Sequence, residues 1–466
     1  MYNLDSRRMR LTTTALGAAL AISWAQAQGA PQTAARPMNV VVLVIDDTRW
    51  DSIGAAGNRI VRTPRLDALA SEGIRFTQAR VATAICMTSR ASLLTGQYMS
   101  RHGIDRFGQQ LTPDAFARTY PGLLRSAGYW TGYVGKYDVG AARPADFDFV
   151  RAYHGRHWIT DADGGRIHVT EQNARDSIEF LRARPKDKPF LLSVGYFAPH
   201  AEDNAKEQYL PQDWSAASYE GVKVPPSPLG DEKHLRALPP FLSNESNEGR
   251  VRFKWRFDTP ERYQQYMIRY YRLITEVDAA VGRLVDELKA QGVYQDTLIA
   301  FIGDNGYFHG DRGLADKWYP YEQALRVPLI VRDPRTPSRR RGATRDQLAL
   351  NIDIAPTIVS AARLLVPDVM QGRDLSPLYL SDEAPAWRDE FFYEHPTITS
   401  RDRIPASQGV IRLDWKYVQW PEFDYEQLFN LKDDGQEIRN LANDPVHATQ
   451  RAKMRRQLDE WRKRAR

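Results

Sequence analysis

The chain of 466 residues contains a single cysteine, Cys86, and therefore no internal disulfide. It has no HExxH pattern and no second cysteine, so the usual zinc signatures are missing. We find no internal repeat and no nucleic-acid motif, and beyond residue 27 no apolar run is long enough to span a bilayer. These absences predict a chain with no nucleic-acid partner and no stable membrane anchor. They leave Cys86 as an inert buried thiol, an intermolecular link or a chemically special residue.

The N-terminus has the pattern of a secretory signal peptide over residues 1–27. Arginines at positions 7, 8 and 10 precede a short apolar stretch, and AQA at 25–27 is a small-x-small cleavage pattern. The arginines also resemble a twin-arginine signal. We expect an exported protein, periplasmic or secreted; the alternative is a disordered tail followed by a short buried helix.

The remaining chain has an ordinary globular composition, with 42% hydrophobic and 11% aromatic residues in the full sequence. It is long enough for a large core and two domains. The formal charge of +6 falls to +4 when the three arginines and Asp5 of the leader are removed. A mildly basic chain suits an anionic substrate, although many proteins without such a partner share this balance.

Apolar β-branched runs alternate with amphipathic stretches along most of the chain. Strands are predicted at 39–45, 130–134, 190–197, 297–302 and 327–331, and helices at 64–73, 172–184 and 261–291. This alternation predicts an α/β fold with a mostly parallel sheet flanked by helices. From about residue 385, short strand patterns and a terminal helix predict a smaller antiparallel α+β domain. We therefore expect a catalytic domain over 38–380 and a C-terminal subdomain over 385–466.

Residues 201–260 do not continue the alternation of strand and helix patterns, because they contain two Pro-Pro pairs and few regular patterns. Within them, RVRFKWRF at 250–257 alternates basic and apolar residues. The alternation predicts a half-buried edge strand with a solvated cationic face. The alternative is a surface for an anionic glycan, on which Trp255 or Phe253 stacks against a sugar.

Four predicted strands end in polar residues: Asp46-Asp47, Lys136, His200 and Asp304-Asn305. In parallel α/β sheets, ligands bind at the carboxyl ends of the strands, so these side chains are expected to converge. The acidic set offers only oxygen ligands, which suit Ca²⁺ or Mg²⁺. Each pair taken alone also fits an ordinary turn.

The stretch ICMTSRASLLTG at 85–96 predicts a helix that Thr88 or Ser89 caps and Gly96 ends. Cys86 would then precede a helix N-terminus, where free amides and the nearby Arg90 favour an anion. Such surroundings lower a thiol pKa. A nucleophile beside a dication indicates transfer of an anionic group such as sulfuryl or phosphoryl.

These residues resemble a type I, formylglycine-dependent sulfatase of the alkaline phosphatase superfamily. The family motif Cys-x-Pro-Ser-Arg followed by a helix ending in Thr-Gly stands here as CMTSR followed by ASLLTG. The resemblance extends through VIDDTRWD, GYWTGYVGK, FAPH, IGDNG, Lys317, YEQALRVPLIV, DIAPT, QGRDLSPL and EQLFNLKDDGQEIRNL. It covers nearly the whole chain after the leader.

The resemblance implies that a maturation enzyme oxidises Cys86 to formylglycine, whose hydrate carries two hydroxyls. One hydroxyl attacks sulfur and expels the alcohol, and the other then expels sulfate. The resemblance also implies Ca²⁺ in preference to Mg²⁺, with Asp46, Asp47, Asp304, Asn305 and the modified residue 86 as ligands.

Further roles follow from the same resemblance. Arg90 would position the hydrated group, and Lys136, His200 and Lys317 would neutralise sulfate oxygens. His200 or Lys317 would protonate the leaving oxygen. His309 is expected to contact substrate, with a structural histidine as the alternative.

Two positions depart from the family pattern. Thr88 replaces the usual proline, which bears on recognition by the maturation enzyme. Asp138 stands where the family has a histidine that accepts a proton during sulfate release. We expect Asp138 to take that role as a base; alternatively, another residue does and Asp138 points away.

The expected reaction is release of sulfate from a sulfate ester, with a sulfated carbohydrate favoured over a small aryl or choline sulfate. Residues 153–165 and 201–260 are the candidate leaving-group pocket. One alternative is a phosphodiester or phosphonate monoester hydrolase of the same superfamily. Another is a calcium-dependent binder of sulfated glycans that has lost catalysis.

Overall fold

The computed structural model describes residues 37–466 apart from residues 154, 204 and 384, and these residues form one compact unit. The predicted signal peptide, residues 1–27, lies outside the described residues. No helix within the described part of the chain is both long and apolar enough to cross a membrane.

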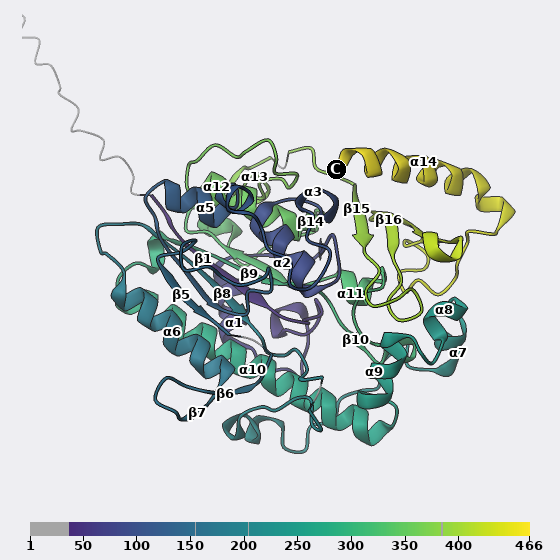
Figure 1. The fold of residues 1–466 in the computed structure, drawn as a ribbon, viewed down its shortest axis with the longest axis horizontal. Coiled ribbons are helices and arrows are strands. Elements are labelled where there is room, and N and C mark those ends of the chain that lie inside the picture. Colours follow the sequence, from purple (N-terminus) through teal and green to yellow (C-terminus); the bar gives the residue numbers. More distant parts are fainter. Residues whose placement is uncertain (1–36, 154, 204, 384) are drawn as a thin grey trace, which may run out of the picture. The chain divides into compact units, whose positions relative to one another are not determined.

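An eight-stranded sheet forms the centre, in the order β13-β2-β12-β9-β1-β8-β4-β5 (Figure 1). Five adjacent strands are parallel: β9 (Thr297–Gly303), β1 (Asn39–Ile45), β8 (Phe190–Tyr196), β4 (Trp130–Gly135) and β5 (Phe149–Ala152). Beyond β9, β12 (Leu329–Arg332) pairs antiparallel with β9, and β2 (Ile74–Phe76) pairs antiparallel with β12. The edge strand β13 (Thr344–Arg345) pairs parallel with β2. The mostly parallel sheet predicted from the sequence is confirmed.

Both faces of this sheet are covered, because alternate residues of β1 enter two different apolar clusters. Val40, Val42 and Val44 belong to one cluster, and Val41, Leu43 and Ile45 to the other. Helices α2 (Cys86–Thr95), α5 (Tyr120–Ser126) and α12 (Ile354–Ala361) contribute to the first cluster. Helices α1 (Pro64–Glu72), α6 (Val169–Ala183) and α10 (Pro260–Ala290) contribute to the second. Burial on both faces explains the continuous apolar strands.

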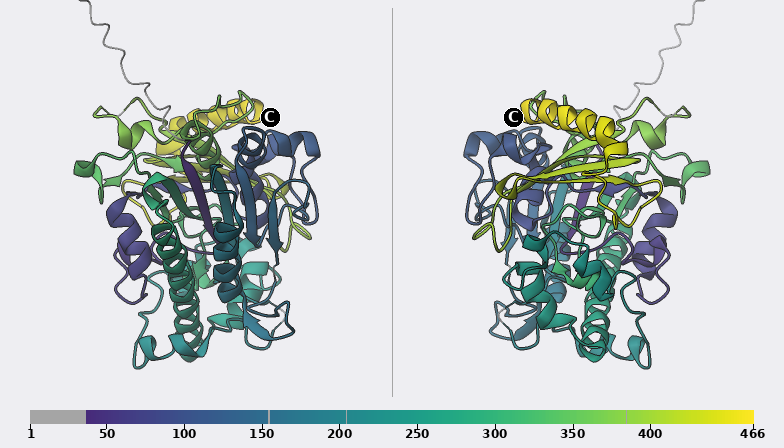
Figure 2. Two further views of the ribbon diagram at one scale, coloured as in Figure 1. Left: turned by 90° about the vertical axis from the view of Figure 1, so that its left-hand side faces the viewer. Right: turned by 90° about the vertical axis from the view of Figure 1, so that its right-hand side faces the viewer.

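A second, antiparallel sheet lies in the C-terminal part. Its strands, in order, are β15 (Glu390–His395), β16 (Ser407–Arg412), β17 (Trp415–Trp420) and β18 (Tyr425–Asn430). The terminal helix α14 (Ala448–Arg464) lies across it, drawn in yellow in Figure 2. The predicted smaller antiparallel C-terminal sheet is confirmed, with residues 409–420 folded as a hairpin.

The predicted edge strand at 250–257 is wrong, because this segment is the helix α9 (Glu248–Arg256). The Asn247 side chain caps the helix by accepting from the Gly249 amide. On a helix, residues four apart share a face, so Glu248, Arg252 and Arg256 lie together. The two arginines bind buried Asp316, which lies far away in the sequence. This tertiary ion pairing overrides the period-two pattern.

The remaining elements are short. The helices are α3 (Met99–His102), α4 (Pro113–Ala117), α7 (Glu232–Arg236), α8 (Pro240–Ser243), α11 (Glu322–Leu325) and α13 (Pro377–Leu380). The strands are β3 (Ala79–Arg80), β6 (Trp158–Thr160), β7 (Arg166–His168), β10 (Phe308–His309), β11 (Ala315–Asp316) and β14 (Ala349–Leu350).

Candidate active site

Polar residues converge at the carboxyl ends of the parallel strands, as the sequence predicts. Asp46 and Asp47 directly follow β1, and Asp304 and Asn305 directly follow β9. The Asp47 amide donates to Asp304 Oδ1 at 3.2 Å, and Asn305 Nδ2 donates to Asp47 Oδ1 at 2.7 Å. All four side chains are fully buried, so the two strand ends form one acidic centre.

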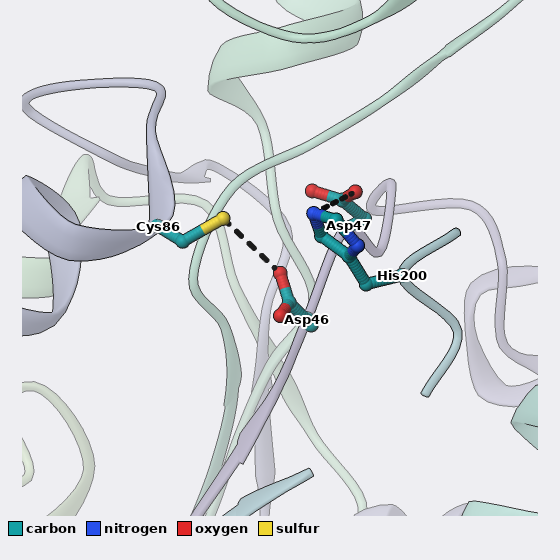
Figure 3. Close-up of side chains that lie close together, drawn as sticks. All are labelled: Asp46, Asp47, Cys86 and His200. Atoms are coloured by element: carbon teal, nitrogen blue, oxygen red, sulfur yellow. Dashed lines mark hydrogen bonds and ion pairs between the residues drawn. The ribbon is translucent and has the colours of Figure 1, made fainter. Parts of the chain in front are cut away.

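Cys86 lies beside this centre, on a helix that packs against one face of the sheet. It is the first residue of α2, and its Sγ lies 3.4 Å from Asp46 Oδ1. Figure 3 shows Cys86 directed at Asp46, with His200 beside Asp47. Candidate ligand atoms of these four residues all lie within 4.8 Å of one another. The parallel sheet and the N-terminus of α2 therefore bring residue 86 and the acidic pair together.

The expected helix start is wrong by about one turn. Ile85, in extended conformation, precedes α2, while the Thr88 hydroxyl donates to Ile104 O at 3.0 Å. Ser89 Oγ accepts from Asn351 Nδ2 at 2.9 Å, so neither side chain caps the helix. Gly96 ends α2 in the left-handed region, with φ 68°, as predicted.

The expectation of an acidic thiol is also wrong. Burial and the neighbouring Asp46 carboxylate raise the pKa of the Cys86 thiol well above its usual value. Lys136 and Lys317 act in the opposite direction but do not outweigh them. The helix N-terminus alone suggested a thiolate, whereas an adjacent buried carboxylate disfavours a second negative charge.

The acidic centre fits a hard cation. Asp47 Oδ2 and Asn305 Oδ1 are buried oxygens without a hydrogen-bond partner among the described residues. A buried oxygen left unpaired is costly, and a bound cation satisfies it. Together with Asp46 and Asp304 these groups form the oxygen-only set that Ca²⁺ prefers.

The acidic residues carry opposite pKa shifts. Burial raises the pKa of Asp46, but Lys136 and the other cations around Asp46 lower it by more, so the net pKa lies well below the usual value. Burial and the Asp46 charge raise the pKa of Asp304 to about 7. One ionised carboxylate thus disfavours the ionisation of its neighbour, a repulsion that a cation between them relieves.

Cationic groups surround the acidic centre. Arg90 donates through Nε to Asp304 Oδ2 at 2.8 Å and through Nη1 to Lys136 O at 2.5 Å. Lys136 Nζ pairs with Asp46, and Lys317 Nζ lies 2.5 Å from Asp47 Oδ1. Both ammonium groups are more than nine-tenths buried, so their charges act at close range.

His200 is oriented by its own loop. Its Nδ1 lies 2.7 Å from the Ala201 carbonyl, which can only accept, so Nδ1 carries a hydrogen. Its Nε2 lies 3.6 Å from Asp47 Oδ2. The second nitrogen therefore faces the centre.

Asp138 lies in the same cavity as Cys86 and Lys136. Its backbone is left-handed, with φ 60°, and its Oδ2 lies 3.1 Å from Lys136 Nζ. Burial raises the Asp138 pKa, but Lys136 and Arg90 lower it more, so the net pKa lies below the usual value. The carboxylate is ionised and faces the site.

His309 does not line this cavity. It is 2% exposed and packs edge-to-face on Tyr270, with ring centroids 4.7 Å apart. Burial holds its pKa well below the usual value. This surrounding favours the structural alternative for His309.

The cavity around Cys86 has a volume of about 450 Å³. Four of the residues that line this cavity come from the two segments predicted to form the leaving-group pocket: Gly155, Asp203, Glu248 and Arg252. Four further lining residues, Ile398, Thr399, Arg403 and Ile404, come from the C-terminal part. Nothing in the sequence pattern marks that loop. Asp316, which binds Arg252 and Arg256, was also missed, and its only signal is its place beside Lys317.

This geometry is typical of a class of protein: an enzyme that transfers an anionic group, with a residue on a helix N-terminus beside a candidate metal site and cations around it. The Sulfatase family model matches residues 38–364, and the model described as N-sulphoglucosamine sulphohydrolase, C-terminal, matches residues 310–464.

Among curated proteins, the chain is 26% identical over 492 residues to an N-acetylglucosamine-6-O-sulfatase of Bacteroides thetaiotaomicron, covering 91% of this chain and 86% of that one. A protein whose structure was solved in complex with its substrate, D-glucosamine-2-N,6-O-disulfate, is 25% identical to this chain, with a TM-score of 0.77. The match covers 92% of this chain and 98% of that one. The phosphonate monoester hydrolase of Silicibacter pomeroyi has a TM-score of 0.78 at 25% identity, covering 92% and 96%.

The chain belongs to the sulfatase family of the alkaline phosphatase superfamily, and it is a sulfatase enzyme.

Proposed function

We propose that the protein releases inorganic sulfate from the sulfate ester of a sulfated carbohydrate, through a formylglycine derived from Cys86 and with bound Ca²⁺. The observation that carries this proposal is the position of Cys86 Sγ, 3.4 Å from Asp46 Oδ1 on the rim of a buried oxygen-ligand set. Two of the proteins named above, the N-acetylglucosamine-6-O-sulfatase and the protein solved with glucosamine-2-N,6-O-disulfate, act on sulfated glucosamine, which supports a sulfated sugar as the substrate class.

Asp46, Asp47, Asp304 and Asn305 would hold Ca²⁺, and the two unpartnered oxygens on Asp47 and Asn305 support this assignment. When bound, the ion supplies positive charge that orients the sulfate group and offsets its negative oxygens. The raised pKa of Asp304 fits a carboxylate that needs such a partner.

The remaining charges have separable roles. Lys136 and Lys317 would bind sulfate oxygens, because their ammonium groups are buried beside the acidic centre. Arg90 holds Asp304 through Nε and the Lys136 backbone through Nη1, which fixes the wall next to residue 86. With its Nδ1 hydrogen bonded to Ala201 O, His200 directs Nε2 toward the centre, and in the imidazolium form Nε2 would donate its proton to the leaving oxygen.

Residue 86 would supply the attacking hydroxyl once it is oxidised and hydrated. The high pKa of the thiol argues against catalysis by the unmodified cysteine. Asp138 would accept the proton of the second hydroxyl of the hydrate, the hydroxyl that expels sulfate. A formylglycine-generating enzyme is the implied partner, and Thr88 would be part of the segment it reads.

Export remains part of the proposal. The leader at residues 1–27 would direct the protein to the periplasm or the medium, by a general or twin-arginine route. Sulfated glycans are extracellular polymers, which suits an exported enzyme. Detection of a mature N-terminus after residue 27 in the periplasmic or secreted fraction would test this.

The decisive experiment is mass spectrometry of the tryptic peptide VATAICMTSR, residues 81–90, from protein made in its native host. A peptide lighter than the thiol form, and reactive toward a hydrazine, is expected. Unmodified cysteine in protein that binds Ca²⁺ and sulfated glycans would favour the non-catalytic binder instead.

A second candidate activity is hydrolysis of a phosphonate monoester, because the phosphonate monoester hydrolase of Silicibacter pomeroyi shares the fold at a TM-score of 0.78. Rates on a sulfate and on a phosphonate with the same leaving group separate the two activities. We expect the sulfate to react faster.

A further inference from the structure

One loop of the C-terminal sheet enters the cavity that contains Cys86. Residues 398–404 lie within the connection between β15 and β16, and the amide of Ile398 donates to Ile404 O at 3.0 Å. Thr399 is left-handed, with φ 66°, which tightens the turn. Because both ends are tied together, the loop holds its side chains in place.

Arg403 is the charged residue through which this loop faces the cavity. Its Nη2 lies 2.5 Å from Glu248 Oε2, and its side chain remains 41% exposed. The Glu248 amide donates to Arg403 O at 3.0 Å, so the backbone is fixed as well. Among the described residues its guanidinium has no other carboxylate partner, which leaves most of its five donors for a ligand.

Arg252, the other arginine in this cavity, is occupied. It pairs with Asp203, with Glu248 Oε1 at 2.8 Å and with Asp316 Oδ2 at 3.0 Å, and its side chain is 16% exposed. Glu248 therefore connects an arginine saturated by three carboxylates to one with free donors. Of these two arginines, only Arg403 is available to an incoming anion.

We propose that Arg403 is a specificity-determining residue that binds a second anionic group of the carbohydrate whose sulfate ester is cleaved, either a sulfate on the same sugar or a carboxylate on the next one. The guanidinium fork matches both groups in a bidentate manner. Trp318, Ile398 and Ile404 line the same cavity and give the sugar ring an apolar surface beside it. This inference rests on the proposed function and names the substrate class more narrowly.

Binding is the direct test, because it does not depend on turnover. In protein carrying Cys86→Ala, calorimetry compares glucosamine 6-sulfate with glucosamine-2-N,6-O-disulfate and with glucosamine 6-sulfate linked to a uronic acid. Arg403→Gln is expected to weaken one of the two doubly anionic ligands by about tenfold or more, and the monosulfate by less than about twofold. The ligand affected identifies sulfate or carboxylate as the second group.

Arg401→Gln is the matched control on the same loop. Arg401 is 57% exposed, lies 3.9 Å from Asp402 and does not line the cavity, so its loss should leave all three affinities unchanged. Equal weakening of every ligand by Arg403→Gln, or no weakening, would overturn the proposal. Failure of all three sugars to bind would also overturn it, whereas sulfate release from an aryl sulfate by the mature enzyme would still support sulfate ester hydrolysis, the reaction of the proposed function.

Discussion

The ammonium of Lys136 lies 3.1 Å from the carboxylate of Asp138, and both line the cavity that Cys86 also lines. Lys136 Nζ pairs with Asp46 as well, so one lysine connects the acidic centre to Asp138. The carboxylate therefore lies in the same cavity as residue 86, as a proton acceptor for that residue would have to.

Replacing Asp138 with alanine should slow the elimination of sulfate. Loss of a general base costs about 10²-fold or more in rate. The readout is single-turnover sulfate release from protein whose residue 86 is fully converted. Asp138→His, which supplies a base of different charge, is expected to retain activity; unchanged elimination in Asp138→Ala would assign the role to another residue.

Removal of calcium should destabilise the folded protein. A cation that binds only the folded state adds RT ln(1 + [L]/Kd), about 2.7 kcal/mol at a hundredfold excess over Kd. Thermal unfolding with and without a chelator should therefore show a lower Tm after chelation. Asn305→Ala removes one ligand oxygen and should reduce the calcium-dependent shift, and an identical shift in that variant would contradict its role.

Gly195 on β8 should not tolerate a side chain. A Cβ built there would lie 2.1 Å from Lys136 O and 2.7 Å from Arg90 Nη1, closer than carbon atoms approach such groups. Gly195→Ala is expected to cost about 1–3 kcal/mol of unfolding free energy and to lower kcat by displacing Arg90. Gly165→Ala is the control, because its Cβ would meet only the Asp161 side chain, at 3.2 Å.

Asp278 of α10 should make stability fall as the pH rises. Its carboxylate accepts from the amides of Leu66 and Arg65 at 2.7 and 3.2 Å, and burial raises its pKa from 3.8 to about 7. A raised pKa means that the folded state binds the proton more tightly. The stabilising contribution is therefore present below about pH 4 and is lost as the pH rises through about 7.

Asp278→Asn removes this titration. The unfolding free energy of the variant relative to the native protein should rise by roughly 1–4 kcal/mol between pH 4 and pH 8. Urea unfolding at several pH values measures the difference. A constant difference across this range would show that Asp278 is not protonated in the folded protein.

Local patterns were enough to predict the parallel strands and the polar residues that follow them. Asp46, Asp304 and Lys136 were found because a strand buried on both faces is an unbroken apolar run, and the first polar residues mark its end. Parallel strands share one carboxyl edge, so convergence followed from topology.

Patterns failed where distant partners decide conformation. Residues 250–257 alternate like a strand but fold as a helix, because Arg252 and Arg256 pair with Asp316, which lies 64 and 60 residues further along the chain. The thiol pKa of Cys86 was mispredicted for a similar reason, since the Asp46 carboxylate beside it is 40 residues away.

The sequence by itself determined the alternation of strands and helices, the family and the set of charged residues at the strand ends, since each depends on local periodicity or on short motifs. Only the tertiary structure decided which groups pair, which oxygens remain unpartnered and which loops enclose the cavity. Arg403 illustrates the difference: it lies more than 300 residues from Cys86 in the chain, yet both line one cavity. Long-range packing brings the two residues to the same cavity, and no local sequence pattern predicts that they meet.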